Sequence, residues 1–119
     1  MIDVDQVRQH LRRWRLHGLL EEQVQTSIAA ALLAGGIKAD REVRLSLHDR
    51  IDFLTTQGVG IEVKLHGRAV EVLAQLERYA ASDRVVALLL VSARSQLTAL
   101  PDVVGGKPLR TLWIGRGIA

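Results

Sequence analysis

The sequence contains no cysteine. This absence excludes a disulfide framework, a thiolate zinc site and a cysteine nucleophile. Three of the four histidines, His10, His17 and His48, show no metal-ligand spacing. The stretch at 105–108, Gly-Gly-Lys-Pro, lacks the second glycine spacing and the hydroxyl residue of a phosphate-binding loop. Nothing in these residues therefore indicates a zinc site or a nucleotide-binding loop.

Long apolar segments are also missing. The longest apolar run, at 85–91, has the length of a strand and is too short to span a membrane. The first 20 residues mix acids, arginines and a tryptophan, and they lack the apolar core of a signal peptide. We therefore expect a cytoplasmic protein with no membrane partner.

Length and composition are those of an ordinary globular domain. The chain has 119 residues, of which 48% are hydrophobic and 24% are charged, so we expect a single domain over 1–119. The net charge of +3 is a weak basic bias that would not by itself show nucleic-acid binding. Its distribution is more informative, because one short segment holds Arg8, Arg12, Arg13 and Arg15 beside His10, His17 and Trp14.

Hydrophobic periodicity predicts a basic helix over 3–17 at the N-terminus. Three- and four-residue spacings place Val4, Val7, Leu11 and Trp14 on one apolar stripe. Arg8, Arg12 and Arg15 fall on another face of this helix. Arginines beside a tryptophan suit phosphate contact and base stacking, which favours DNA binding, whereas the alternative is a solvated face with Trp14 in the core.

The remaining pattern alternates between the periods of helices and strands. A helical pattern between strands implies a crossover connection and some parallel pairing. The predicted order is ααβββαβ(α)β, an α/β fold with a mixed sheet flanked by helices. After the basic helix, the expected elements are a helix at 19–34, strands at 42–47, 50–56 and 60–66, a helix at 69–81, a strand at 84–92, a loop or short helix near Pro101, and a strand at 109–114.

Three charged residues on two of these strands form a candidate catalytic group. Glu62 and Lys64 lie two apart, so they point to one face, and Asp52 comes near Glu62 if the strands pair as a hairpin. Facing carboxylates repel unless a cation lies between them, and hard oxygen ligands suit Mg²⁺ or Mn²⁺. A neighbouring lysine stabilises charge on a phosphate. The pattern suits phosphodiester hydrolysis, although charged residues on a strand are more often solvated surface.

The wider pattern resembles the PD-(D/E)XK nuclease superfamily. Its elements are Arg-Ile-Asp-Phe at 50–53, Gly-Ile-Glu-Val-Lys at 60–64 and Gln-Leu-Glu-Arg-Tyr at 75–79. The last is similar to the Gln-x-x-x-Tyr element of the RecB-like branch. The resemblance covers roughly 21–91, and Ile51 stands where the name-giving proline would be. It implies a restriction-endonuclease-like core.

The resemblance also implies roles for individual residues. Asp52 and Glu62 would bind Mg²⁺ or Mn²⁺, with the Val63 carbonyl as a further ligand, and Lys64 would position the attacking water. Gln75 and Tyr79, four apart on one helix face, would lie near the site and help to hold the DNA strand or the catalytic residues. Without the motif, Gln75 reads as a surface amide and Tyr79 as a half-buried core residue.

The family also carries an acid on the helix before the first strand, and two residues compete for this place. Glu21 lies along the packed stripe, three before Val24 and seven before Ile28, whereas Glu22 is turned about 100° away. An acid on the packed side needs a partner, which favours Glu21 as a metal ligand and catalytic residue. Alternatively, both are first-turn acids favoured by the helix dipole. His66 follows on the Lys64 face and suits either a scissile phosphate or ordinary surface.

Three functions compete. The first is a metal-dependent deoxyribonuclease, either endonuclease or exonuclease. The second is a nucleic-acid-binding module of the same fold without catalysis. The third is a protein-interaction subunit. A domain of this size offers a small DNA footprint, so a homodimer, or a larger nuclease–helicase, phage or defence assembly, would extend it.

Overall fold

A mixed six-stranded sheet forms the centre of the computed structural model, which describes residues 2–115. The strand order is β1-β2-β3-β4-β6-β5. The pairs β3–β4 and β4–β6 are parallel, and the other neighbouring pairs are antiparallel. The strands are β1 (Ala39–Arg44), β2 (Arg50–Thr55), β3 (Val59–Val63), β4 (Ala87–Ser92), β5 (Val103–Val104) and β6 (Lys107–Trp113).

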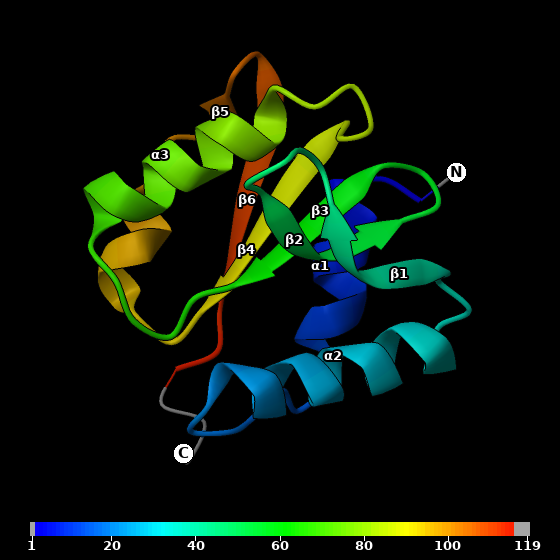
Figure 1. Cartoon of the computed structure of the whole chain (residues 1–119). Helices are drawn as coiled ribbons and strands as arrows, with labels where there is room; N and C mark the ends of the chain where they lie inside the picture. Colours follow the sequence, from blue (N-terminus) through cyan, green and yellow to red (C-terminus); the bar gives the residue numbers. More distant parts are fainter. Residues whose placement is uncertain (1, 116–119) are drawn as a thin grey trace.

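Helices cover both faces of this sheet (Figure 1). The helices α1 (Val4–Arg12) and α2 (Glu21–Ala34) pack on one face, where Phe53, Ile61 and Leu89 belong to their hydrophobic cluster. The helix α3 (Ala69–Ala80) packs on the other face, and a short 3-10 helix, η1 (Ser95–Ala99), lies beside it. The predicted α/β class with a mixed sheet between helices is confirmed. Met1 and residues 116–119 of the predicted domain lie outside the described residues.

The central strand β4 is apolar because it is covered on both faces. All six of its residues are buried, and successive side chains alternate between the two hydrophobic clusters. The helix α3 makes the crossover from β3 to β4, which accounts for their parallel pairing. No helix among residues 2–115 has the length and apolar character needed to span a membrane.

The first helix is shorter than the predicted 3–17. It begins at Val4, behind an Asp3 cap whose carboxylate accepts from the Gln6 amide, and it ends at Arg12. The chain then leaves the helical path so that Leu16, 5% exposed, enters the core in place of Trp14, which is 43% exposed. The expectation that Trp14 continues the apolar stripe is therefore wrong.

Several strand boundaries also differ from the predicted ones. The first strand covers 39–44 rather than 42–47, because a turn begins at Leu45, whose amide donates to the Asp49 carbonyl. Leu47 consequently lies 79% exposed in that turn. The third strand covers 59–63 rather than 60–66, so both Lys64 and His66 lie beyond its end and the predicted shared strand face does not extend to His66. The short strand β5 was not predicted.

Candidate active site

The site begins where β2 and β3 separate. The ladder between these strands pairs Phe53 with Ile61 and Leu54 with Gly60, and it stops before Asp52 and Glu62. The two carboxylates take over the backbone donors that the ladder leaves there. The Val63 amide donates to Asp52 Oδ2 at 2.8 Å, and the Asp52 amide donates to Glu62 Oε1 at 3.2 Å. Each carboxylate is thus held by a backbone amide of the opposite strand, and the two acids lie side by side.

Lys64 lies next to this acidic pair. Its Nζ is 3.6 Å from Glu62 Oε2, and its side chain is 25% exposed while that of Glu62 is 5% exposed. The Lys64 amide donates to the Val91 carbonyl, which extends the β3–β4 pairing beyond the end of β3. The ammonium group is therefore positioned at the solvent side of a buried carboxylate.

A tyrosine and a glutamine from α3 support Glu62 from behind. The Tyr79 hydroxyl is 3.4 Å from Glu62 Oε2 and donates to the Arg50 carbonyl at 3.0 Å, and Gln75 Nε2 donates to that hydroxyl at 2.8 Å. Tyr79 is fully buried and Gln75 is half-buried. The spacing of four on one helix face thus produces a direct contact, and it links α3 to β2 and β3.

Burial and mutual repulsion change the protonation of the two acids. Burial, followed by the Asp52 charge, raises the pKa of Glu62 to about 8, against the lowering effect of Lys64. Burial also raises the pKa of Asp52, and the Val63 hydrogen bond partly offsets it. Burial raises the pKa of Tyr79 as well. Even with Lys64 beside it, the raised pKa favours a protonated Glu62 at neutral pH, and a divalent cation between the acids would favour the ionised form.

The Tyr79 hydroxyl faces two acceptors, the Arg50 carbonyl and Glu62 Oε2. A phenol has one proton to donate, and the Arg50 carbonyl, at 3.0 Å, is its nearer acceptor. The second acceptor is Glu62 Oε2, at 3.4 Å, and a hydrogen bond donated by Tyr79 lowers the pKa of Glu62. In the ionised state, the carboxylate and the Arg50 carbonyl would compete for the single Tyr79 proton.

Glu21, at the start of α2, approaches the same site from the opposite helical layer. Its Oε2 accepts from the Leu65 amide at 3.0 Å, just beyond β3, and its charge contributes to the raised pKa of Asp52. The neighbouring Glu22 is exposed. The structure thus places Glu21, rather than Glu22, beside the acidic pair, as the packed stripe predicted.

Glu42 is a further acid near the site that the sequence analysis did not single out. It lies on β1 between Arg41 and Val43, which pair with Phe53 and Ile51, so it is beside Asp52. Its charge also raises the pKa of Asp52. Its φ of 52° interrupts the regular strand, in a region that non-glycine residues rarely occupy. Because Asp40, Arg41 and Arg44 nearby are also charged, the sequence did not distinguish Glu42 from ordinary surface residues.

The predicted DNA-binding residues Arg8, Arg12, Arg15 and His66 are not bonded to the acids in the part of the chain that the structure describes. Within residues 2–115, no hydrogen bond or ion pair joins Arg8, Arg12 or Arg15 to the acidic pair or Lys64. Arg8 instead contacts Asp5 at 3.5 Å, and Arg15 follows the end of α1, so the three do not share one helix face. His66 is exposed. The predicted common arginine face is therefore wrong, because α1 ends at Arg12.

The donor chemistry of the site fits a hard divalent cation. The carboxylates of Asp52 and Glu62 lie together in a partly buried position, and burial raises the pKa of both. A cation between them would balance their negative charge. Among the described residues, no group of three or more histidine, aspartate or glutamate side chains converges closely enough to hold a metal alone. Two carboxylates leave coordination positions for water and phosphate, as Mg²⁺ prefers.

Comparisons of the chain with models of known families, with curated proteins and with solved structures give no match.

Proposed function

We propose that the protein is a metal-dependent nuclease that hydrolyses DNA phosphodiester bonds, with a restriction-endonuclease-like core. The observation that carries the proposal is the arrangement of Asp52, Glu62 and Lys64 at the point where β2 and β3 separate. Two carboxylates with raised pKa values and an adjacent ammonium group suit cation binding next to a phosphate. The sequence resemblance to PD-(D/E)XK nucleases supports the same assignment.

Each residue has a distinct role in this proposal. Asp52 and Glu62 would bind Mg²⁺ or Mn²⁺, with the Val63 carbonyl as a further ligand; such an ion, when bound, activates water and polarises a phosphodiester. Lys64 would position the water and stabilise the negative charge that develops on the phosphate. The third acid, Glu21, would hold the cation or its water.

Tyr79 and Gln75 act through Glu62 rather than on the phosphate alone. The Tyr79 hydroxyl and the Gln75 amide form a chain that ends at Glu62 Oε2, so they orient this carboxylate. They also connect the catalytic strands to α3, the helix that the DNA strand would approach. This arrangement favours a catalytic site over a binding module, because binding DNA alone does not require buried acids.

A cleavage assay tests the proposal. Supercoiled plasmid and end-labelled single-stranded DNA are incubated with the protein in Mg²⁺, in Mn²⁺ and in EDTA. We expect cleavage that requires the cation and disappears in Asp52→Asn and Lys64→Ala. The matched control is Asp40→Asn, which removes an exposed acid on the neighbouring strand. Equal cleavage by the parent and both site variants would contradict the assignment, and DNA binding without any cleavage would favour the inactive module.

A further inference from the structure

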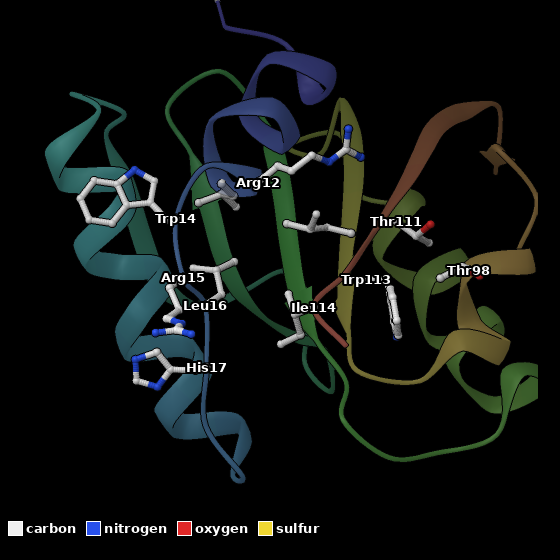
Figure 2. A pocket seen from close by; sticks show the side chains of 11 residues that line it. Arg12, Trp14, Arg15, Leu16, His17, Thr98, Thr111, Trp113 and Ile114 are labelled. Carbon is white, nitrogen blue, oxygen red and sulfur yellow. The ribbon is translucent and has the colours of Figure 1, made fainter. Parts of the chain in front are cut away.

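The two tryptophans of the chain line one surface cleft. This cleft has a volume of about 600 Å³ and lies between the segment that follows α1 and the C-terminal half of β6. Figure 2 shows Trp14 and Trp113 at opposite ends of the lining residues, with Arg12 and Leu16 between them and the Trp14 ring turned toward α2. The rings come from segments that are far apart in the sequence. Folding alone brings them to the same hollow.

Both indole rings are exposed, in contrast to the other aromatic side chains of the protein. Trp14 is 43% exposed and Trp113 is 56% exposed, whereas Phe53 and Tyr79 are buried. The Trp113 indole nitrogen donates to the Ala93 carbonyl at 3.1 Å, and the Trp14 ring packs at a tilt against His10, with 6.3 Å between centroids. Each ring is thus held in place while a large part of it faces solvent.

The charge of the cleft is of one sign among the described residues. Arg12, Arg15 and His17 line it, and no aspartate or glutamate does. The hydroxyl groups of Thr98 and Thr111 add hydrogen-bonding capacity on the side of η1 and β6. Aromatic faces between basic side chains are the chemistry that binds single-stranded nucleic acid, whose bases stack while its phosphates are neutralised.

The cleft lies at the same end of the sheet as the candidate active site. Val63 pairs with Val91 in parallel register, so the next residues, Lys64 and Ser92, lie side by side. Ser92 in turn pairs with Trp113, so Lys64 and Trp113 lie on either side of β4 at the same level. The two residues are two strands apart, a backbone separation of about 10 Å. Side-chain alternation puts Trp113 on the α3 face, where the ion pair with Glu62 also places Lys64, whereas Trp14 follows α1, which packs on the other face. The cleft is therefore lined from both faces at this end of the sheet. One DNA strand that passes this end of the sheet can therefore contact Lys64 and the cleft.

We propose that the cleft between Trp14 and Trp113 binds unpaired nucleotides of DNA next to the cleaved phosphate, so that the substrate is single-stranded DNA or a frayed or flapped end. The inference rests on the proposed nuclease function, because bound DNA is a substrate only if the protein cleaves it. Binding of unpaired bases in the cleft does not itself require cleavage. A continuous duplex would leave the indole faces without bases to stack on.

Intrinsic fluorescence tests the inference directly, because both tryptophans of the protein lie in the cleft. The full chain is titrated with a (dT)12 oligonucleotide and with a blunt hairpin duplex, in EDTA at low salt, so that no cleavage occurs. We expect saturable quenching by (dT)12 at concentrations at least tenfold lower than by the duplex. Absence of quenching by (dT)12, or tighter binding of the duplex, would overturn the proposal.

Single substitutions assign the effect to the cleft. Trp14→Ala and Trp113→Ala should each weaken (dT)12 binding by about tenfold in fluorescence anisotropy with a labelled oligonucleotide. The control is Leu33→Ala, which removes a side chain that is 82% exposed on α2 and does not line the cleft. Far-ultraviolet circular dichroism verifies folding, and Trp14→Phe and Trp113→Phe supply milder replacements. Parental affinity in both alanine variants would overturn the proposal.

The outcomes separate this inference from the proposed function. Tight (dT)12 binding with quenching, in a protein that cleaves no DNA, would support the cleft and reject the nuclease. Metal-dependent cleavage of duplex DNA that is unchanged in both tryptophan variants would support the nuclease and reject the cleft.

Discussion

At the scale of single residues, the notable feature is an acidic pair that takes the place of a strand ladder. Asp52 and Glu62 accept hydrogen bonds from the backbone amides of Val63 and Asp52 where β2 and β3 no longer pair. Satisfying those donors lets the fold keep two carboxylates together in a buried position. The residual cost is visible as the raised pKa of each acid.

Glu62 should make stability depend on pH. Without metal, the native state keeps the Glu62 proton up to pH about 8, while the unfolded state loses it near the ordinary value of 4.5. The native state then binds more protons, so the free energy of unfolding falls as pH rises from 4.5 to 8, by at most about 1.4 kcal/mol per pH unit from this group. Glu62→Gln should flatten this decline in urea titrations in EDTA. An equally steep decline in Glu62→Gln would contradict the raised pKa.

The choice between the two acids at the start of α2 gives a matched pair of variants. Glu21→Gln should lower the cleavage rate by about tenfold or more, because Glu21 lies beside the acidic pair, while Glu22→Gln should leave it unchanged. Both substitutions remove one charge from the same helix turn, so they share any effect on the helix dipole. Single-turnover cleavage compares them, and equal rates would remove Glu21 from the site.

At the scale of elements, the shortened α1 changes what the N-terminal arginines can do. Arg8 contacts Asp5, which also accepts from Arg110 Nε at 3.0 Å, so its charge is already partly balanced. Arg12 and Arg15 line the tryptophan cleft instead. The three arginines predicted to share one face therefore have different surroundings: Arg8 belongs to an ion-pair network, and Arg12 and Arg15 line the cleft.

This division predicts different salt dependences. Arg12→Ala combined with Arg15→Ala should reduce the magnitude of the slope of log affinity against log salt by roughly 1.4, as expected for two lost contacts with a single strand. Arg8→Ala should leave the slope near that of the parent. Anisotropy with labelled (dT)12 at several salt concentrations, in EDTA, measures both. An equal loss of slope in the two variants would restore the single arginine face.

At the scale of the whole molecule, the sheet is a layer between two separate cores. Leu89 belongs to the core under α1 and α2, and Leu90 belongs to the core under α3, although they are neighbours on β4. Both side chains are fully buried. The position of the site depends on this layering, since Glu21 reaches it from one layer and Tyr79 from the other.

Truncation of either leucine should therefore destabilise the whole domain. Leu89→Ala and Leu90→Ala should each lower the free energy of unfolding by about 2–5 kcal/mol, the usual cost of removing a buried leucine side chain. The exposed Leu33→Ala should change it by less than about 0.5 kcal/mol. Urea unfolding followed by circular dichroism measures all three. A small effect of Leu89→Ala alone would mean that α1 and α2 do not pack as described.

The sequence by itself determined the order of the main helices and strands and the candidate catalytic residues. The alternation at 60–66 and the four-residue spacing of Gln75 and Tyr79 are local patterns, and local patterns are set by the periods of strands and helices. The packed side of Glu21 could be found for the same reason.

The tertiary structure alone decided where long-range partners meet. The burial of Leu16 instead of Trp14 depends on the space left under α1, and the contact of Glu21 with Leu65 joins residues 44 apart in the chain. The meeting of Trp14 with Trp113 and the position of Glu42 beside Asp52 likewise follow from strand order and register. No local period contains that information, because such contacts come from the packing of layers that are distant in sequence.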